Sequence, residues 1–511
     1  MLRNILTIGS WTFASRILGF LRDMLIAAMI GAGPLADAFF IALRLPNLFR
    51  RLFGEGAFNA AFVPAFAGTL ALEGPRKARE LAEHMSTLLG LWLTLLVVLG
   101  MVFMPQVMSV LTPGLIDEPL RFDLVVELSR ITFPYLLFIC LTALVSGVLN
   151  AIDKFALAAG APLLFNLFAI VSLFALTPFV ATPAHALAWG SMASGLAQLA
   201  MVTLACHRAG MGFRLFTWPR LTPETRRVVR TMLPGILGAS ISQLSLAIDM
   251  FIATLLPAGA VSYLNYADRV AQLPLGVVGA AIGTALLPVL SRQLRSGKAL
   301  SAHRSMNRAA ELSLALALPA AAALMVLAEP IVLVLFQRGA LTVAQAHAVA
   351  DALVAYAAGL PAFVLIKAFA PGFFARGDTA TPVKIGIAVV ALNLAASLTL
   401  VLGLGFGHVG IAMATSTAAW ANALLLLGIL ARRGHWIADR RLRRNLWRLA
   451  AATLLMAAVL AVLAPLLFPA RGLWQLLALG LLVGAGLVTY FGATQALGAL
   501  RLQDLRRMRR G

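Results

Sequence analysis

Residues 15–23 read SRILGFLRD, and residues 37–58 read DAFFIALRLPNLFRRLFGEGAF. Both stretches are largely apolar, yet together they carry five arginines: Arg16, Arg22, Arg44, Arg50 and Arg51. A cation at bilayer depth costs roughly 2.5–3.5 kcal/mol on insertion scales, so such residues normally face a bundle interior or a water-filled cavity. This density of charge predicts a polar chamber inside a membrane that holds an anion.

The rest of the chain fits a membrane setting. Of its 511 residues, 61% are hydrophobic and only 12% are charged, with a mean hydropathy of +0.92. Soluble domains carry about 25% charged residues. Apolar runs of about 20 residues, each able to cross about 30 Å of hydrocarbon, recur throughout. We predict an all-α polytopic membrane protein with fourteen transmembrane helices, approximately at 5–30, 36–70, 85–111, 124–149, 156–179, 184–206, 228–256, 260–290, 309–335, 346–375, 383–403, 408–431, 446–467 and 472–499.

The distribution of positive charge predicts the topology. With the N-terminus inside, 30 of the 41 Lys and Arg residues fall in inner segments, 3 in outer loops and 8 within spans. This asymmetry follows the positive-inside rule and places both termini in the cytoplasm. The net charge of +21 therefore reflects topology, and we expect no nucleic-acid partner.

A weak internal sequence repeat suggests how the spans are grouped. The second span ends NAAFVPAFAG (59–68) and the eighth ends GTALLPVLS (283–291), each with a proline near the inner end. Parallel repeats are common in transporters, with the substrate site between the halves. We expect an N-lobe at 1–220 (spans 1–6), a C-lobe at 221–436 (spans 7–12), and an addition at 437–511 that contains spans 13–14 and a basic cytoplasmic tail.

Charged residues in the second span share one helical face. Steps of seven residues drift by only about 20° around an α-helix. Asp37, Arg44 and Arg51 therefore lie on one face of the helix, and Glu55 lies on the same face. On the first span, Arg16 and Asp23 share a face. A helix that scattered charge into lipid would not keep this register.

Arginine predominates among these cations, which suits bidentate capture of phosphate or pyrophosphate oxygens. The embedded acids would hold the arginines in place or aid release of the ligand; they are Asp23, Asp37, Glu55 and Asp268. Two other interpretations stay open. The charges could form purely structural ion pairs between helices, and three of the arginines could snorkel to an interface: Arg44, Arg50 and Arg130.

Proline and glycine near these charges predict interrupted backbone. Pro46 removes an amide donor, and glycines follow at 54 and 56. The same pattern occurs at Leu273–Gly276 after Asp268 and Arg269, and at Pro371–Gly372 after Lys367. Broken backbone at membrane depth is tolerated only where it is buried or lines water. We therefore expect helix breaks at these places.

An isolated carboxylate, Asp249, lies in the seventh span without a basic neighbour in sequence. It could bind a monovalent cation or carry a proton for coupling, with neutral oxygens from Asn393, Ser397 and Thr415. A protonated or locally hydrogen-bonded aspartate is the competing interpretation. Cys140 and Cys206 lie in different apolar stretches and are expected to be buried thiols.

At these residues the chain resembles a known family. The segments that carry the likeness are SRILGFLRD (15–23), GAGPLADAFFIALRLPNLFRRLFGEGAFNAAFVP (31–64), YADRVAQLPLGVVGAAIGTALLPVLS (266–291) and APGFFARGDTATPVKI (370–385). They closely resemble the MurJ (MviN) lipid II flippases of the multidrug/oligosaccharidyl-lipid/polysaccharide exporter superfamily.

The resemblance implies a bacterial cytoplasmic-membrane protein that moves lipid II from the inner to the outer leaflet by alternating access. The family's cavity arginines match Arg16, Arg22, Arg51 and Arg269. Its cavity acids and polar residues match Asp23, Asp37, Asn47, Glu55 and Asp268. The resemblance also implies that spans 13 and 14 form a groove for the polyprenyl tail. Some relatives bind sodium through a second carboxylate on span eleven, where this chain has Asn393 and Ser397.

Two alternative functions would require different sequence features. A drug or cation antiporter, or an exporter of another polysaccharide lipid, would use the same fold, but antiporters for cationic drugs need an acidic chamber. A membrane enzyme acting on polyprenyl pyrophosphates usually needs a carboxylate pair for metal or a His nucleophile. Asp117-Glu118 is the only adjacent acidic pair in the chain. We expect a monomeric transporter in contact with membrane lipids and without a cofactor, and the driving force stays open between Na⁺, H⁺ and membrane potential.

Overall fold

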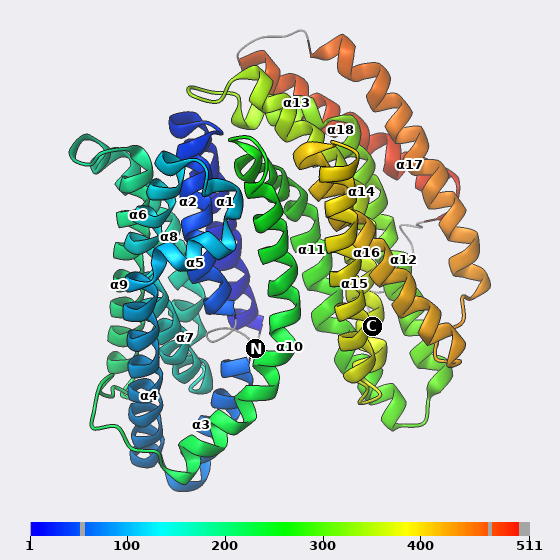
Figure 1. Ribbon diagram of the computed structural model, residues 1–511. Helices are drawn as coiled ribbons and strands as arrows, with labels where there is room; N and C mark the ends of the chain where they lie inside the picture. The colour runs from blue at the N-terminus through cyan, green and yellow to red at the C-terminus, as the bar shows by residue number, and fades with distance from the viewer. Residues whose placement is uncertain (1, 52–56, 469–472, 500–511) are drawn as a thin grey trace. The chain divides into compact units, whose positions relative to one another are not determined.

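The computed structural model describes residues 2–51, 57–468 and 473–499. Within these ranges the secondary structure is helical and no strand occurs. Backbone contacts divide the chain into two compact units, Met1–Ser262 and Tyr263–Gly511. The boundary falls in the first turn of α11 (Figure 1).

Among the residues that the structure describes, unit 1 holds ten α-helices and the first turn of α11. Their bounds are α1 (Leu2–Ile30), α2 (Pro34–Phe49), α3 (Ala57–Glu73), α4 (Pro75–Val102), α5 (Met104–Leu111), α6 (Pro119–Thr132), α7 (Tyr135–Ala151), α8 (Phe155–Ala175), α9 (Pro183–Arg208) and α10 (Pro223–Thr254). Short 3₁₀ turns lie at Pro113–Leu115 and Thr177–Phe179.

Unit 2 holds the remainder of α11 and seven further helices. Their bounds are α11 (Ala260–Arg295), α12 (Ala299–Val326), α13 (Ala328–Phe336), α14 (Val343–Phe374), α15 (Ala380–Leu398), α16 (Gly407–Arg432), α17 (Arg440–Leu467) and α18 (Leu473–Ala496). A π-helical turn, Thr399–Gly403, extends α15.

Small residues let helices approach closely inside each unit. In unit 1, α8 packs on both α1 and α9, and a Cβ added at Gly190 would lie 2.0 Å from Ser172 Oγ. In unit 2, α14 packs on α12 and α16, and a Cβ at Gly359 would lie 2.5 Å from Ser416 Oγ. Such small-residue contacts are typical of helix packing in lipid, where van der Waals fit replaces hydrophobic driving force.

The two C-terminal helices pack within unit 2. α17 lies against α12 and α18, and α18 also contacts α13. Tyr490 on α18 donates a hydrogen bond of 2.6 Å to the carbonyl of Ala315 on α12. Leu449, Met456 and Leu460 of α17 are buried in the same apolar cluster. These contacts attach both helices to the body of unit 2.

Local sequence signals account for many helix starts. Proline occupies an early position of α2, α4, α6, α9 and α10, where the missing amide hydrogen has no intrahelical partner to lose. Thr342 and Gln345 form a capping box at α14, and Asp439 accepts from the amide of Leu442 at α17. Turn and cap chemistry thus positions the helix ends.

Ten helical segments are long and apolar enough to cross a membrane: α4, α6–α7, α8, α9, α12, α14, α15 with its π turn, α16, α17 and α18. The described parts of all fourteen predicted spans are occupied by helices. The four spans outside the set of ten correspond to α1, α2–α3, α10 and α11. Those four carry most of the embedded charge.

The expected helix breaks at proline are wrong in the described residues. α2 continues through Pro46 to Phe49, α11 through Pro274, and α14 through Pro371. One proline removes a single hydrogen bond, and neighbouring turns and helices can keep the remaining backbone helical. The predicted break at Gly54 and Gly56 lies outside the described residues.

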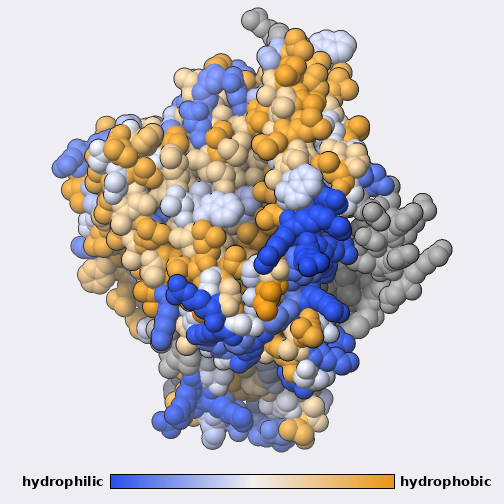
Figure 2. Space-filling view, turned by 90° about the vertical axis from the view of Figure 1, so that its right-hand side faces the viewer, coloured by the Kyte–Doolittle hydropathy of each residue, from blue (hydrophilic) through white to orange (hydrophobic). Residues whose placement is uncertain are grey.

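The surface is broadly apolar. Large exposed hydrophobic side chains occur along many helices, and α17–α18 alone present Leu454, Val462, Leu466, Leu481 and Val488. Figure 2 shows one face on which apolar residues cover wide areas and hydrophilic residues gather in the lower part of the view. Apolar faces of this extent would be a liability in water but match a lipid environment.

Candidate functional site

The most completely bonded charge in α1 is Arg22. Its Nε and Nη2 donate to Asp23 Oδ1 at 3.0 and 2.6 Å, and its Nη1 donates to Asn166 Oδ1 at 3.0 Å. The guanidinium also lies 5.2 Å from the ring centre of Phe165. Arg22 and Asp23 are buried, with relative exposures of 7% and 0%. Charge pairing and hydrogen bonds together offset the cost of burying these ions.

Asn166 of α8 was not among the predicted site residues. Its Oδ1 accepts from Arg22, and its Nδ2 donates to the carbonyl of Ser15 at 3.0 Å. A Cβ added at Gly19 would lie 3.3 Å from Asn166 Nδ2, so the glycine leaves space for this amide. The asparagine therefore connects α8 to α1 and orients Arg22. An amide inside an otherwise apolar span was the available signal in the sequence.

Two other predicted arginines of unit 1 are exposed. Arg16 lies on α1, six residues before Arg22, and has no hydrogen bond or ion pair to a described residue. Arg51 follows the end of α2 and is also exposed. Arg16 and Arg51 are thus exposed residues, whereas Arg22 is buried.

Asp37 anchors α2 to the start of α11. Its Oδ2 accepts from the amide of Gly259 at 2.6 Å, and its Oδ1 accepts from the amide and hydroxyl of Ser262 at 2.8 and 2.5 Å. Arg121 Nη2 lies 3.9 Å from the same carboxylate. A carboxylate on the free amides of a helix N-terminus also benefits from the helix dipole. All these partners belong to unit 1.

The aligned face predicted for the second span has mixed exposure. Asp37 is buried, Arg44 is half-buried and Arg51 is exposed. Asn47 is half-buried and donates to the carbonyl of Leu43 within α2 at 2.9 Å. Glu55, the last member of the face, lies outside the described residues.

In unit 2, the predicted pair lies in the third turn of α11. Arg269 is exposed, and Asp268 is half-buried and accepts a hydrogen bond from Gln272 one turn later. The neighbouring Val270 and Ala271 are buried. The helix therefore carries an exposed arginine beside an aspartate that accepts a hydrogen bond from a glutamine amide.

The residues suggested for a cation are divided between the units. Asp249 of α10 is buried in unit 1. In unit 2, Asn393 and Ser397 lie one turn apart on α15 and are almost fully buried, at 1% and 0% exposure. Thr415 on the adjoining α16 donates to the carbonyl of Ile411 at 2.9 Å. No group of three or more His, Cys, Asp or Glu residues with metal-site geometry occurs among the described residues.

Each unit carries arginines of a kind that could recognise an anion. Unit 1 offers the exposed residues Arg16 and Arg51, and the buried Arg22. Unit 2 offers Arg269. Guanidinium groups bind phosphate oxygens through paired, charge-assisted hydrogen bonds and stay charged at all physiological pH values.

Comparison with known proteins identifies the family. The family model described as "Lipid II flippase MurJ" matches residues 26–481. The chain belongs to the MurJ family of lipid II flippases.

Individual MurJ relatives match over almost the whole chain. A probable lipid II flippase MurJ from Rhizobium meliloti (strain 1021) is 43% identical over 99% of this chain and 96% of its own length. A probable lipid II flippase MurJ from Vibrio cholerae is 34% identical over 99% of this chain and 98% of its own. A lipid II flippase MurJ from Burkholderia cenocepacia is 38% identical over 76% of each chain.

Solved structures show the same fold. A lipid II flippase MurJ in an inward closed conformation matches with a TM-score of 0.79 and 24% identity, over 98% of this chain and 99% of that one. An inward-facing multidrug-resistance transporter of the MATE family matches more distantly, with a TM-score of 0.66 and 15% identity over 82% of this chain and 95% of that one. The MurJ-like arrangement of helices therefore covers both units.

Proposed function

We propose that this protein moves lipid II, the undecaprenyl-pyrophosphate-linked peptidoglycan precursor, from the inner to the outer leaflet of the bacterial cytoplasmic membrane. The observation that carries the proposal is membership of the MurJ family over nearly the full length. A flippase is a transporter, so neither an enzyme acting on polyprenyl pyrophosphates nor an antiporter is favoured. Lipid II is the implied partner, and we expect a monomer that works without a cofactor.

The proposed topology has fourteen spans with both termini in the cytoplasm. Ten spans meet the length and hydropathy expected of a membrane helix. The other four carry the charges assigned to the site. We propose that the chain contains two repeated lobes of six spans each, 1–220 and 221–436, followed by an addition at 437–511. We propose that α17 and α18 present their exposed apolar side chains to the polyprenyl tail.

The arginines have separable tasks in this proposal. Arg16, Arg51 and Arg269 are exposed and would contact the diphosphate first. Arg22 is held by Asp23 and Asn166, and we propose that it joins by exchanging Asp23 for a phosphate oxygen. The guanidinium of Arg22 keeps its charge-assisted hydrogen bonds in this exchange. When the carboxylate of Asp23 binds Arg22 again, it would favour release of the diphosphate on the outer side.

Alternating access supplies the movement. A doubly charged headgroup cannot cross hydrocarbon unaided because burying unpaired charge costs far more than thermal energy supplies. Guanidinium groups replace its hydration while the lobes change from an inward-open to an outward-open state. Asp37, Asn47, Glu55 and Asp268 complete the proposed polar lining.

The driving force stays open between Na⁺, H⁺ and membrane potential. We propose Asp249, Asn393, Ser397 and Thr415 as the group to test for monovalent-cation binding. Two of these, Asn393 and Ser397, are buried directly before the π-helical turn of α15, and such turns are frequent at functional sites.

Complementation tests the function. Cells depleted of their own lipid II flippase should regain outward exposure of lipid II when they produce this protein. Variants with Arg16, Arg22, Arg51 or Arg269 changed to Ala should fail at normal membrane levels, because each removes a phosphate-binding guanidinium. Full activity of all four variants would show that the anion site lies elsewhere.

A further inference from the structure

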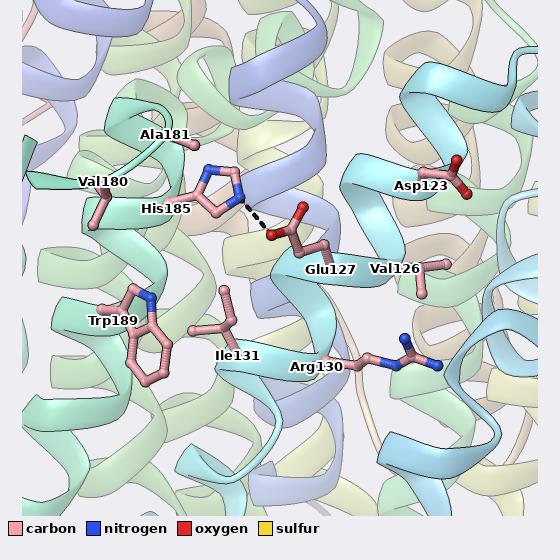
Figure 3. A pocket seen from close by; sticks show the side chains of 9 residues that line it. All are labelled: Asp123, Val126, Glu127, Arg130, Ile131, Val180, Ala181, His185 and Trp189. Carbon is pink, nitrogen blue, oxygen red and sulfur yellow. Dashed lines mark ion pairs between the residues drawn. The ribbon is translucent and has the colours of Figure 1, made fainter.

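An open pocket with a cavity volume of about 690 Å³ lies in unit 1 between α6 and the beginning of α9 (Figure 3). None of the residues assigned to the lipid II site lines it. Asp123, Glu127 and Arg130 line it from α6, at three- and four-residue spacings that place them on one side of the helix. His185 and Trp189 line it from α9.

Two of the ionisable groups are already paired with each other. His185 Nε2 lies 3.2 Å from Glu127 Oε1, and His185 Nδ1 lies 2.8 Å from the hydroxyl of Thr182. His185 is buried, with a relative exposure of 6%. Figure 3 shows the imidazole directed toward the Glu127 carboxylate across the pocket. This pair joins α9 to α6 and forms the wall of the pocket.

The other two charges are available. Asp123 and Arg130 are both exposed. The carboxylate of Asp123 has no hydrogen bond or ion pair to any described residue. Arg130 uses Nε to donate to the carbonyl of Met101 at 3.0 Å, which leaves both Nη nitrogens uncommitted within the described chain. The bond to Met101 fixes the direction of the guanidinium.

The order of these charges along α6 suggests the ligand. Seven residues of helix advance about 10.5 Å along the axis. In the topology proposed above, α6 begins at the outer surface, so Asp123 lies nearer water and Arg130 lies two turns deeper. Trp189, which lines the pocket from α9, is 45% exposed, and tryptophan is enriched at the membrane interface. A phospholipid of the outer leaflet presents its groups in the same order, with the amine outermost and the phosphate beneath it.

We propose that this pocket binds the headgroup of a zwitterionic phospholipid with a primary amine, such as phosphatidylethanolamine. Arg130 would bind the phosphate through its free Nη groups, and Asp123 would accept hydrogen bonds from the ammonium. A trimethylated amine has no hydrogen to donate to Asp123. A headgroup without an amine would leave the carboxylate beside an anion. The pocket should therefore select the primary amine over both alternatives.

Lipid retention measures this selectivity. The purified full-length protein is placed in nanodiscs of equal proportions of phosphatidylethanolamine, phosphatidylcholine and phosphatidylglycerol with identical acyl chains, and retained lipids are counted by native mass spectrometry after mild delipidation. The wild type should retain phosphatidylethanolamine about tenfold over either competitor, as expected for one charge-assisted hydrogen-bonded contact. Asp123→Asn should lose the preference over phosphatidylcholine. Arg130→Gln should lower the retention of phosphatidylethanolamine and of phosphatidylcholine. Arg130→Lys should keep most of that retention.

Asp117→Asn is the matched control, because Asp117 is an exposed acid that does not line the pocket, and it should behave like the wild type. Equal retention of the three lipids by the wild type, or an unchanged preference in Asp123→Asn, would overturn the proposal. Displacement by water-soluble phosphoethanolamine at concentrations comparable with the lipid would also overturn it, in favour of a soluble ligand. The leaflet rests on the proposed topology, but headgroup preference is read without transport, so failure here is distinguishable from failure of the flippase proposal.

Discussion

The two units place their charges differently. In unit 1, Arg22, Asp23 and Asp37 are buried among helices, and each is held by partners from another part of the fold or by its neighbour. In unit 2, the arginines of the ion pairs stay partly exposed even where the carboxylate is buried. Arg308, in the third turn of α12, bonds to the buried Glu311 and to Asp439 just before α17. Arg433, just after α16, pairs with Asp378 between α14 and α15.

This difference separates two uses of charge. A partly exposed ion pair stays partly hydrated and contributes little beyond local order. A buried guanidinium is costly unless its partners satisfy it, so its retention in unit 1 favours a role in binding over a role in stability alone. The comparison predicts that changes in unit 1 affect transport most and that changes at the partly exposed pairs of unit 2 affect mainly stability.

The largest expected effect comes from breaking the buried pair in α1. Arg22→Gln removes the cation beside Asp23, and breaking a buried ion pair from one side typically costs about 3–5 kcal/mol. The variant should lose both thermal stability in detergent and lipid II transport. Arg22→Gln combined with Asp23→Asn should recover most of the stability, because no buried charge is left, but should not recover transport.

Two outcomes with these variants would contradict the proposed difference between the charges of unit 1 and unit 2. Normal transport by the double variant would show that Arg22 serves only structure, as the partly exposed pairs of unit 2 do. Unchanged stability of Arg22→Gln would show that the carboxylate does not depend on its cation. Thermal unfolding and complementation are measured on the same set of proteins.

A smaller effect is expected at Asn166. Asn166→Leu removes the acceptor for Arg22 Nη1 and the donor to Ser15, and a hydrogen bond to a charged group contributes about 1.5–3 kcal/mol. Lipid II exposure in complemented cells should fall by about tenfold or more, because Arg22 loses its orientation. Asn150→Leu on the exposed end of α7 is the control and should transport normally. Equal activity of both variants would exclude Asn166 as a positioning residue.

The smallest effect is expected at the end of unit 2. Hydrogen bonds from Thr381 and then the Arg433 guanidinium hold the pKa of Asp378 well below its ordinary value. A depressed pKa means that the carboxylate stabilises the fold when charged and loses this contribution only as pH falls through the lowered pKa. Asp378→Asn should therefore lower the unfolding temperature slightly, and by nearly the same amount at about pH 6 and about pH 8, which both lie above the ordinary pKa of an unfolded aspartate.

Salt sharpens this last test. Added salt should reduce the difference between Asp378→Asn and the wild type, because the Arg433 pair is partly exposed. Asp351→Asn, at an exposed position on α14, should match the wild type throughout. A difference that changes between the two pH values would contradict the depressed pKa. Transport should be retained, in contrast to the unit 1 variants.

Much of the fold follows from residue patterns. Apolar runs predicted an all-helical chain, and the described residues are helical without strands, because a backbone in lipid must satisfy its own hydrogen bonds. Proline was less informative: α11 runs through Pro274 and α14 through Pro371 where breaks were expected. A local rule fails there because surrounding helical turns keep the chain regular after one lost bond.

The candidate site was also predictable only in part from the sequence. Residue type and spacing selected Arg22, Asp23 and Asp37 as embedded charges, and all three are buried. Their partners were beyond sequence reasoning: Asn166 lies 144 residues from Arg22, and Ser262 lies 225 residues from Asp37. Spacing along one helix carries no information on which distant helix packs beside it.

Residue patterns alone establish that this protein is helical, lies in a membrane and keeps guanidinium groups where hydrocarbon would exclude them, because hydropathy and charge are properties of each residue. Which arginine is buried and which is exposed follows from the packing of the helices. Arg16 and Arg22 are chemically identical and lie on the same helix, yet Arg22 alone meets Asn166 of α8. Packing decides this because a side chain's partners depend on the helices around it and not on its own position in the chain.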